Sequence, residues 1–129
     1  MPLTRISLLG GKSPEYLSAL SDSLHRALVE AFDIPADDRF QVFDQHEPGE
    51  LVFDHHYLGG PRSDDFTLFE ITFSRPRSSE TKKAFYRRLV TLLVQSPGLR
   101  PKDVMAIITT TGREDLSMAN GVAPMIENA

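Results

Sequence analysis

Pro2 is the first residue of this chain whose type and position could do chemistry. Methionine is normally removed before a small residue such as proline, so we expect the processed chain to begin with a free secondary amine. An α-amino group has a reference pKa of about 7.7–8.0, so this amine could act as a general base when neutral or as an acid when protonated. It could also attack a carbonyl and form an iminium. Pro2 is therefore a candidate catalytic residue.

Two arginines and one aspartate are the other candidates. Arg75 and Arg77 lie in FSRPRS, directly after a predicted strand, and guanidinium groups hold carboxylates through paired hydrogen bonds. They could bind a small oxo acid, or they could form a solvated basic turn. Asp38, in IPADDRFQ, could orient a water molecule or hydrogen-bond a substrate carbonyl hydrate. Its alternative is a structural role in a turn or helix cap.

Other polar clusters do not indicate a cofactor or a metal. The histidines at 46, 55 and 56 match no familiar ligand spacing, and the chain has no cysteine, which excludes thiolate zinc sites. No glycine-rich phosphate-binding motif is present. A net charge of −4 argues against general binding to nucleic acid or acidic membranes, and no apolar run approaches the length of a membrane span. We expect a cytoplasmic protein without cofactor, metal, nucleic-acid partner or membrane segment.

Apolar periodicity and turn residues predict one domain over 1–129 with four strands and two helices. The first helix begins after the cap Ser13, with Pro14 at its first position, and ends near Asp33, because a proline two residues later disfavours helical backbone. The second begins after Ser78 and ends at Pro97. The predicted strands cover 2–9, 40–43, 66–73 and 104–110.

The two halves of the chain repeat one plan. A shift of 65 residues without a gap superposes nine identical residues, including both helix caps. The pairs are Leu3–Leu68, Ile6–Ile71, Ser13–Ser78, Glu15–Glu80, Ala19–Ala84, Leu24–Leu89, Leu28–Leu93, Val29–Val94 and Asp38–Asp103. This pattern favours a duplicated β-α-β unit, with repeats at about 2–46 and 66–111, a connecting hairpin or loop at 47–65 and a tail at 112–129.

Two such units predict an α+β fold in which a four-stranded sheet carries both helices on one face. Each crossover is expected to be right-handed, which places its helix on the same side of the sheet. The other face would then be left uncovered. Because an apolar sheet face in water is unfavourable, we expect other subunits to bury it.

Pro2 and the segments IPADDRFQ, QHEPGELVF and FSRPRSSETKKAFY together resemble the tautomerase superfamily. Length and spacing are most similar to its malonate semialdehyde decarboxylase branch, over nearly the whole chain. The resemblance implies a homotrimer of duplicated β-α-β subunits, with active sites near subunit boundaries and cofactor-free chemistry on small carboxylates. It also implies that Pro2 is the catalytic amine, that Arg75 and Arg77 bind the substrate carboxylate, and that Asp38 assists with water or substrate orientation.

One region departs from that branch. Where the branch carries pocket-lining aromatics, this chain has Leu116, Met118 and Met125, and it has no tryptophan. Smaller and more flexible walls would reshape the substrate pocket and change how well it excludes water. We expect the type of chemistry to survive this change more readily than the identity of the substrate.

The leading hypothesis is therefore a decarboxylase or hydratase of a short 3-oxo acid such as malonate semialdehyde. In this reaction a cationic Pro2 would polarise the carbonyl and stabilise the enolate left by CO2, although an iminium route is equally compatible. Keto–enol tautomerisation of a 2-oxo acid such as phenylpyruvate, with neutral Pro2 as the base, is the enzymatic alternative. A non-catalytic trimeric interaction domain is the third hypothesis.

Overall fold

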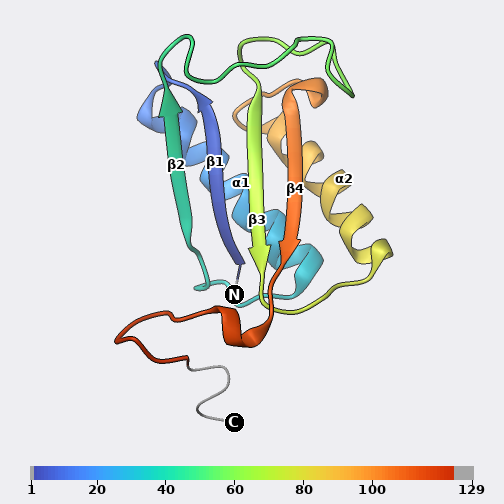
Figure 1. Ribbon diagram of the computed structural model, residues 1–129. Helices are drawn as coiled ribbons and strands as arrows, with labels where there is room; N and C mark the ends of the chain where they lie inside the picture. The colour runs from blue at the N-terminus through green and yellow to red at the C-terminus, as the bar shows by residue number, and fades with distance from the viewer. Residues whose placement is uncertain (1, 124–129) are drawn as a thin grey trace.

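The computed structural model describes residues 2–123 and shows four strands in one sheet with two helices behind it (Figure 1). The regular elements are β1 (Pro2–Leu9), α1 (Pro14–Phe32), β2 (Gln41–His46), β3 (Thr67–Phe73), α2 (Ser79–Gln95) and β4 (Val104–Thr110), with 3-10 turns at Pro101–Asp103 and Arg113–Asp115. The fold is the predicted α+β arrangement of two β-α-β units.

The pairing of the strands reproduces the repeat seen in the sequence. The sheet order is β2-β1-β3-β4; the two strands within each unit are parallel, and β1 and β3 are antiparallel at the centre. Thr4 lies opposite Gln41 in the first unit, and Phe69 lies opposite Ala106 in the second. These two pairs are related by the same 65-residue shift, so the units share a register as well as an order of elements.

Both helices begin in the same way because both carry a serine cap. The side chain of Ser13 accepts a hydrogen bond from the backbone N–H of Tyr16, and that of Ser78 accepts one from the N–H of Thr81, each at 3.1 Å. Such a cap satisfies one of the backbone donors that the first turn leaves unpaired. At the other end, α1 stops at Asp33, which adopts the left-handed conformation with φ 54°.

The core lies between the sheet and the two helices. Alternate residues of β1 and β3 point toward the helices, and the leucines of α1 and α2 meet them there. Burying one aromatic or aliphatic side chain of this kind stabilises the fold by about 1.5–3 kcal/mol. The largest fully buried core side chains are Phe32, Phe69, Phe73, Phe85, Ile6, Leu8, Leu20, Leu24, Ile71, Leu89 and Leu93.

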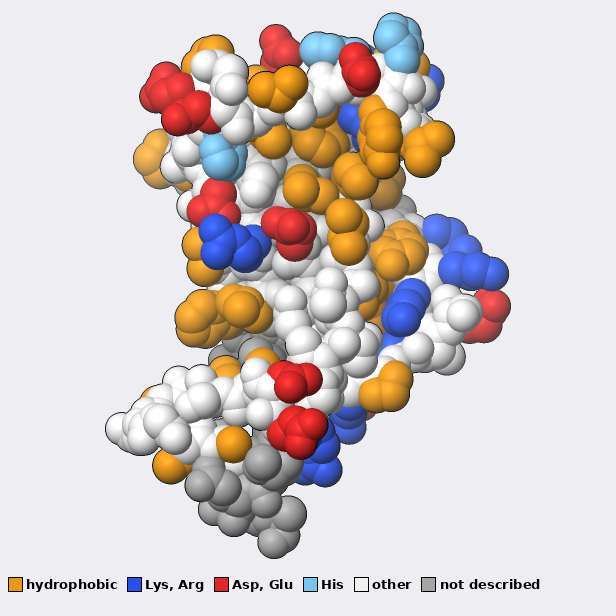
Figure 2. Space-filling model, viewed as in Figure 1, with side chains coloured by type: hydrophobic (Ala, Val, Ile, Leu, Met, Phe, Trp, Pro, Cys, Tyr) orange, Lys and Arg blue, Asp and Glu red, His pale blue; other side chains and the backbone are white. Residues whose placement is uncertain are grey.

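The opposite face of the sheet, which Figure 2 shows, mixes apolar and charged side chains. Arg5 of β1 pairs with Asp44 of β2 at 2.7 Å, and Glu70 lies beside Arg5 on β3. Ile107 of β4, on the same face, is 43% exposed. The sequence predicted an apolar face, whereas the observed one carries an ion pair across two of its strands.

The connecting segment between the units covers the upper part of that face. Phe66, just before β3, is 4% exposed because the ring of Phe53 lies 4.5 Å away and the guanidinium of Arg62 lies 5.3 Å from its ring centre. The segment contains turns but neither helix nor strand. No helix in the described part of the chain is long and apolar enough to cross a membrane.

The predicted bounds of the first and fourth strands match the observed ones, whereas those of the second and third differ slightly. The second strand was predicted to end at residue 43, but β2 runs on to His46 because its last residues pair with Ser7, Leu8 and Leu9 of β1. The polar residues at 44–46 hide this extension from a hydrophobicity pattern. What matters for function is that β1 begins at the same end of the molecule at which β3 and β4 end (Figure 1).

Candidate active site

Pro2 opens β1 and is not among the residues that line the arginine-rich cavity described below. It is buried, and the antiparallel register places it directly opposite Phe73, the last residue of β3. The chain then turns away from the sheet through Ser74 and Arg75 toward Arg77. The pairing of β1 with β3 therefore brings the start of the chain close to the two predicted substrate-binding arginines, which lie two and four residues beyond its strand partner.

Beyond the end of β3 lies a cavity of about 420 Å³. Its wall combines the turn after β3, the segment after α1 and one residue from the 3-10 turn after β4. The lining residues are Asp33, Ile34, Pro35, Ser74, Arg75, Arg77 and Arg113. Among the described residues, three guanidinium groups and a single carboxylate face this space, although the whole chain carries a net charge of −4. A surplus of positive charge in a hollow of this size suits an anionic small molecule.

Arg77 lies against two aromatic rings at the inner wall of the cavity. Its Cζ is 5.6 Å from the ring centre of Phe32 and 5.5 Å from that of Phe73. Its Nε is buried and has no hydrogen-bond partner in the described structure. Burial lowers the pKa of Arg77 below its usual value, and repulsion from Arg75 lowers it further, while Asp33 acts in the opposite direction. A bound carboxylate would relieve that repulsion and supply the missing acceptor.

Asp38 lies on the other side of β1 from Arg75. The backbone N–H of Thr4 donates to the carbonyl of Phe40 at 3.1 Å, which anchors the DRF segment beside the first residues of β1. Continuing the parallel register back from Thr4 and Gln41 places Pro2 next to this segment. Asp38 is half-buried there, and its backbone N–H donates to the carbonyl of Pro35.

Leu116 and Met118 line a second, smaller hollow of about 220 Å³, together with Leu3, Phe40 and Ser117. Leu3 follows Pro2 and points to the opposite face of the sheet. Leu116 and Met118 therefore lie near the start of β1, but they do not line the cavity that holds the arginines. Met125, the third predicted wall residue, lies outside the described residues.

Comparison with known proteins gives the family. Two families of tautomerase enzymes match the chain, one over residues 38–119 and the other over residues 2–60. A probable tautomerase of Bacillus subtilis (strain 168), YusQ, is 36% identical over 127 residues, which cover 98% of this chain and 100% of that protein. The chain belongs to the tautomerase family.

Solved structures agree with this tautomerase assignment. A malonate semialdehyde decarboxylase is 35% identical and superposes with a TM-score of 0.88 over 98% of this chain and 97% of its own. The FG41 malonate semialdehyde decarboxylase is 32% identical, with a TM-score of 0.87 over 98% and 95%. A fused 4-OT, which forms a symmetric trimer, shares the fold with a TM-score of 0.78 over 98% and 99% at 20% identity. The predicted superfamily, branch and fold are thereby confirmed.

Arg113 lines the cavity with Arg75 and Arg77 and was not predicted from the sequence. It opens the 3-10 turn after β4 and is followed by Glu114 and Asp115, so in the sequence it resembles part of a solvated, mixed-charge turn. The sequence did offer one signal for Arg113, which is its position directly after the strand β4. Because β3 and β4 are parallel neighbours that end at the same edge of the sheet, a residue after β4 lies close to Arg75 and Arg77, which follow β3.

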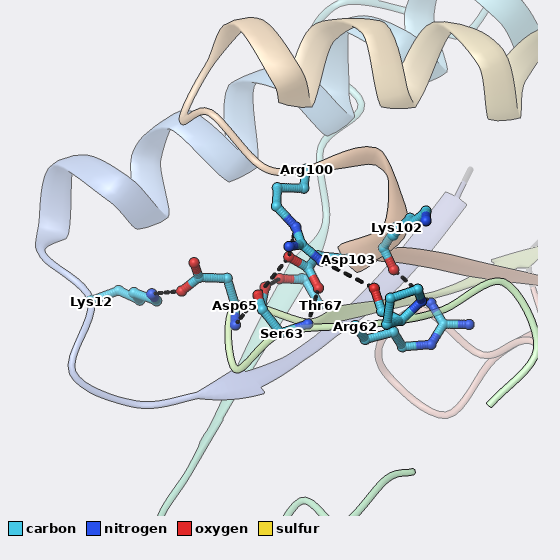
Figure 3. A network of polar contacts seen from close by, with 9 residues as sticks. Lys12, Arg62, Ser63, Asp65, Thr67, Arg100, Lys102 and Asp103 are labelled. Carbon is cyan, nitrogen blue, oxygen red and sulfur yellow. Dashed lines mark hydrogen bonds and ion pairs between the residues drawn. The ribbon is translucent and has the colours of Figure 1, made fainter. Parts of the chain in front are cut away.

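Asp103, the repeat counterpart of Asp38, is held in a network of hydrogen bonds that joins two segments of the fold. Asp103 is 0% exposed; its carboxylate accepts hydrogen bonds from the backbone N–H of Ser63 at 2.6 Å and the hydroxyl of Ser63 at 2.7 Å, and Arg100 pairs with it at 3.3 Å (Figure 3). The buried Arg62 nearby donates to the carbonyl of Lys102 at 2.9 Å. This network fastens the connecting segment to the start of β4. Among the described residues no group of acidic and histidine side chains is arranged to hold a metal ion.

Proposed function

We propose that this tautomerase is a cofactor-free decarboxylase and hydratase of a short 3-oxo acid such as malonate semialdehyde, with the amine of Pro2 as its catalytic group. The observation that supports the proposal is the antiparallel pairing of Pro2 with Phe73, because Phe73 leads directly into the turn whose Arg75 and Arg77 line a cavity with three guanidinium groups. Two solved relatives that share about a third of the sequence are malonate semialdehyde decarboxylases, which supports the same substrate class.

In the proposed reaction Arg75 and Arg77 hold the carboxylate of the substrate, and the protonated amine of Pro2 donates a hydrogen bond to its carbonyl oxygen. The bond between the carboxyl carbon and the neighbouring carbon breaks, CO2 leaves, and the electron pair moves onto the carbonyl oxygen as an enolate. The cationic amine stabilises that charge, and a proton then restores the aldehyde. Asp38, on the other side of β1, orients the substrate or a water molecule for hydration.

Keto–enol tautomerisation of a 2-oxo acid is the second candidate, and one observation favours it. The hollow formed by Leu3, Phe40, Leu116 and Met118 is mostly apolar and lies near Pro2, so it could receive the hydrocarbon part of a substrate whose carboxylate reaches the arginines. The curated relatives of Bacillus subtilis, YusQ and YrdN, are both described as probable tautomerases. In that reaction Pro2 would have to be neutral and act as the base.

We also propose that the chain forms a homotrimer. The support is the exposed sheet face with its partly apolar side chains, including Ile107, and the trimeric assembly of the fused 4-OT that shares this fold. The alternative is a non-catalytic trimer that has only inherited the fold. The following experiment excludes it if the wild type releases CO2 and the site variants lose that activity.

The test compares release of CO2 from malonate semialdehyde by the wild-type enzyme, Pro2→Ala and Arg75→Ala, with Arg87→Ala as a control. Arg87 is an exposed arginine on α2, away from the cavity. We expect both site variants to lower kcat/KM by about 10²–10⁴-fold, the range for loss of a catalytic or charge-stabilising group, and Arg87→Ala to match the wild type. Full activity in both site variants would refute the assignment.

Two further measurements separate the mechanisms. Mass spectrometry of the intact protein shows whether Met1 has been removed, because a retained methionine would convert the amine of Pro2 into an amide and stop every mechanism that uses it. A pH–rate profile of kcat/KM then reports the pKa of the essential amine. A pKa below about 7 favours the base of a tautomerase, and one above about 8 favours the acid of a decarboxylase.

A further inference from the structure

The cavity at the end of β3 gathers most of the described arginines whose side chains form no hydrogen bond or ion pair. The chain contains ten arginines, and all of them lie in the described part. Six form side-chain hydrogen bonds or ion pairs: Arg5, Arg26, Arg39, Arg62, Arg88 and Arg100. Of the four arginines that form none within residues 2–123, three line this cavity and the fourth, Arg87, lies on the surface of α2. The cavity therefore carries a local excess of positive charge that no described side chain neutralises through an ion pair.

The three guanidinium groups come from two walls. Arg75 and Arg77 belong to the turn that follows β3, and they are close enough to lower the pKa of Arg77 by mutual repulsion. Arg113 belongs to the 3-10 turn that follows β4. The backbone N–H of Thr111 donates to the carbonyl of Phe73 at 2.8 Å, so the two turns diverge from adjoining strand ends. Arg113 therefore faces the same space from a different segment.

A single carboxylate does not account for this arrangement. One carboxylate has two oxygens and is fully engaged by the pair Arg75 and Arg77, each of which can offer parallel N–H donors. The proposed three-carbon substrate carries one carboxylate, which leaves the charge of Arg113 unmatched in a cavity of about 420 Å³. Asp33 supplies the only carboxylate among the described lining residues, and it forms no ion pair with any of the three arginines in the described structure.

We propose that Arg113 is a specificity-determining residue that binds a second anionic group, so that the preferred substrates are short oxo-dicarboxylates. This inference rests on the proposed function for the reacting end of the substrate. In such a substrate one carboxylate lies β to the keto group and leaves as CO2, while the other stays bound as a handle. The electron pair of the broken bond passes to the keto oxygen, and a proton completes the 2-oxo acid product, so no oxidant or further reactant is needed.

The binding experiment uses unreactive probes: malonate, succinate and glutarate against acetate and propionate, titrated by calorimetry at fixed ionic strength. We expect the wild type to bind at least one dicarboxylate about 10-fold or more tightly than the matched monocarboxylate, since a charge-assisted hydrogen bond contributes a factor of this order. Arg113→Ala and Arg113→Gln should abolish that preference, and Arg87→Ala should retain it. Melting temperatures of all variants show whether the fold is kept.

The kinetic experiment compares oxaloacetate, a dicarboxylate, with malonate semialdehyde. We expect Arg113→Ala to lower the ratio of kcat/KM for oxaloacetate to that for malonate semialdehyde by about 10-fold or more, mainly through KM. A wild type without dicarboxylate preference, or a preference that survives in both Arg113 variants, overturns the inference. If dicarboxylates bind through Arg113 but neither substrate reacts, the proposed function fails and the specificity inference stands. If malonate semialdehyde is turned over without any dicarboxylate preference, the proposed function stands and the specificity inference fails.

Discussion

The two β-α-β units have the same backbone plan but opposite chemistry at the end of their first strands. In the second unit β3 leads into Arg75 and Arg77, whereas the same positions after β1 hold Gly10 and Lys12. Each turn borders a hollow, of about 420 Å³ after β3 and about 440 Å³ after β1. The duplication thus supplies two equivalent places for a site, and the side chains decide which one can bind an anion.

The hollow after β1 is acidic, and its lysine is already paired. Its lining includes Glu47, Asp64 and Asp65, and the ammonium of Lys12 forms an ion pair with Asp65. The counterpart of Pro2 in the second unit is Thr67, which lies inside the chain and so has no free amine. Within the described residues, Pro2 and three of the four arginines whose side chains form no hydrogen bond or ion pair belong to the end of the molecule where β3 and β4 finish, so we expect one active site in each subunit.

The largest expected effect is on kcat/KM, and it compares Arg77 with Lys12, which occupies the equivalent position in the first unit. Arg77→Ala should lower kcat/KM for a 3-oxo acid by about 10²–10³-fold, because it removes a partly desolvated guanidinium from the carboxylate. Lys12→Ala, the matched change in the first unit, should leave kcat/KM within about twofold. Steady-state kinetics of the two variants side by side is the measurement. Equal losses in both would mean that the hollow after β1 also takes part in the reaction.

The next effect concerns Asp103 and Asp38, which occupy matching places in the repeat. Asp103→Ala should lower the free energy of unfolding by about 2–3 kcal/mol, because the hydroxyl and backbone N–H of Ser63 would lose their buried acceptor. Asp38→Ala should cost less than about 1 kcal/mol, since Asp38 is only half-buried, but it should reduce activity. Urea unfolding of both variants checks this, and a reversed order of the two stabilities would contradict it.

The sequence was informative about the fold because its signals are local and occur twice. The caps Ser13 and Ser78, the alternating residues of the strands and the proline after α1 each act over a few residues, and the constant shift of 65 residues tied them into one topology. The same shift could not show that Asp103 is buried and Asp38 only partly so. That difference depends on Ser63, which lies in the connecting segment, 40 residues before Asp103 in the sequence, and donates to its carboxylate.

The sequence predicted those candidate residues whose type or motif is itself unusual, and it missed those that depend on where the strands end. Pro2 and Arg75 stand out because a terminal amine and a paired arginine motif are unusual, and in the structure Pro2 lies opposite Phe73, two residues before Arg75. Arg113 did not stand out, because its role depends on where β4 ends relative to β3. Leu116 and Met118 were predicted to line the substrate pocket; in the structure they border a hollow with Leu3 and Phe40 that is distinct from the arginine-lined cavity, and their role stays a prediction.

A smaller effect on the free energy of unfolding tests whether the two helix caps, which have the same geometry, contribute equally to stability. Ser13→Ala and Ser78→Ala should each lower the free energy of unfolding by about 1 kcal/mol, because each removes an N-cap hydrogen bond of 3.1 Å. Replacement by glycine should cost only a few tenths of a kcal/mol. Chemical denaturation of the four variants provides the values. A difference between the two alanine variants above about 1 kcal/mol would show that the helix starts, despite equal geometry, contribute unequally.

The smallest expected effect is on the free energy of unfolding when the charge of Lys12 or of Arg77 is removed, and it has opposite signs in the two units. Asp65 raises the pKa of Lys12, chiefly through its hydrogen bond, whereas burial and Arg75 lower that of Arg77. Lys12→Met should therefore cost at most about 0.5 kcal/mol at neutral pH, as for an exposed ion pair. A raised folded-state pKa stabilises fully below the reference value of 10.5 and is lost as the pH rises through the folded value, so this cost should vanish at strongly alkaline pH.

Arg77→Met should instead leave the free energy of unfolding unchanged or raise it, because the charged form is disfavoured in the folded protein and the thioether can still pack against Phe32 and Phe73. Denaturant unfolding at pH 7 and above pH 11 measures both variants. A loss of stability in Arg77→Met as large as that in Lys12→Met would mean that Arg77 already has a stabilising partner in the free protein. The cavity after β3 would then resemble the hollow after β1, and the case for an open anion site would fail.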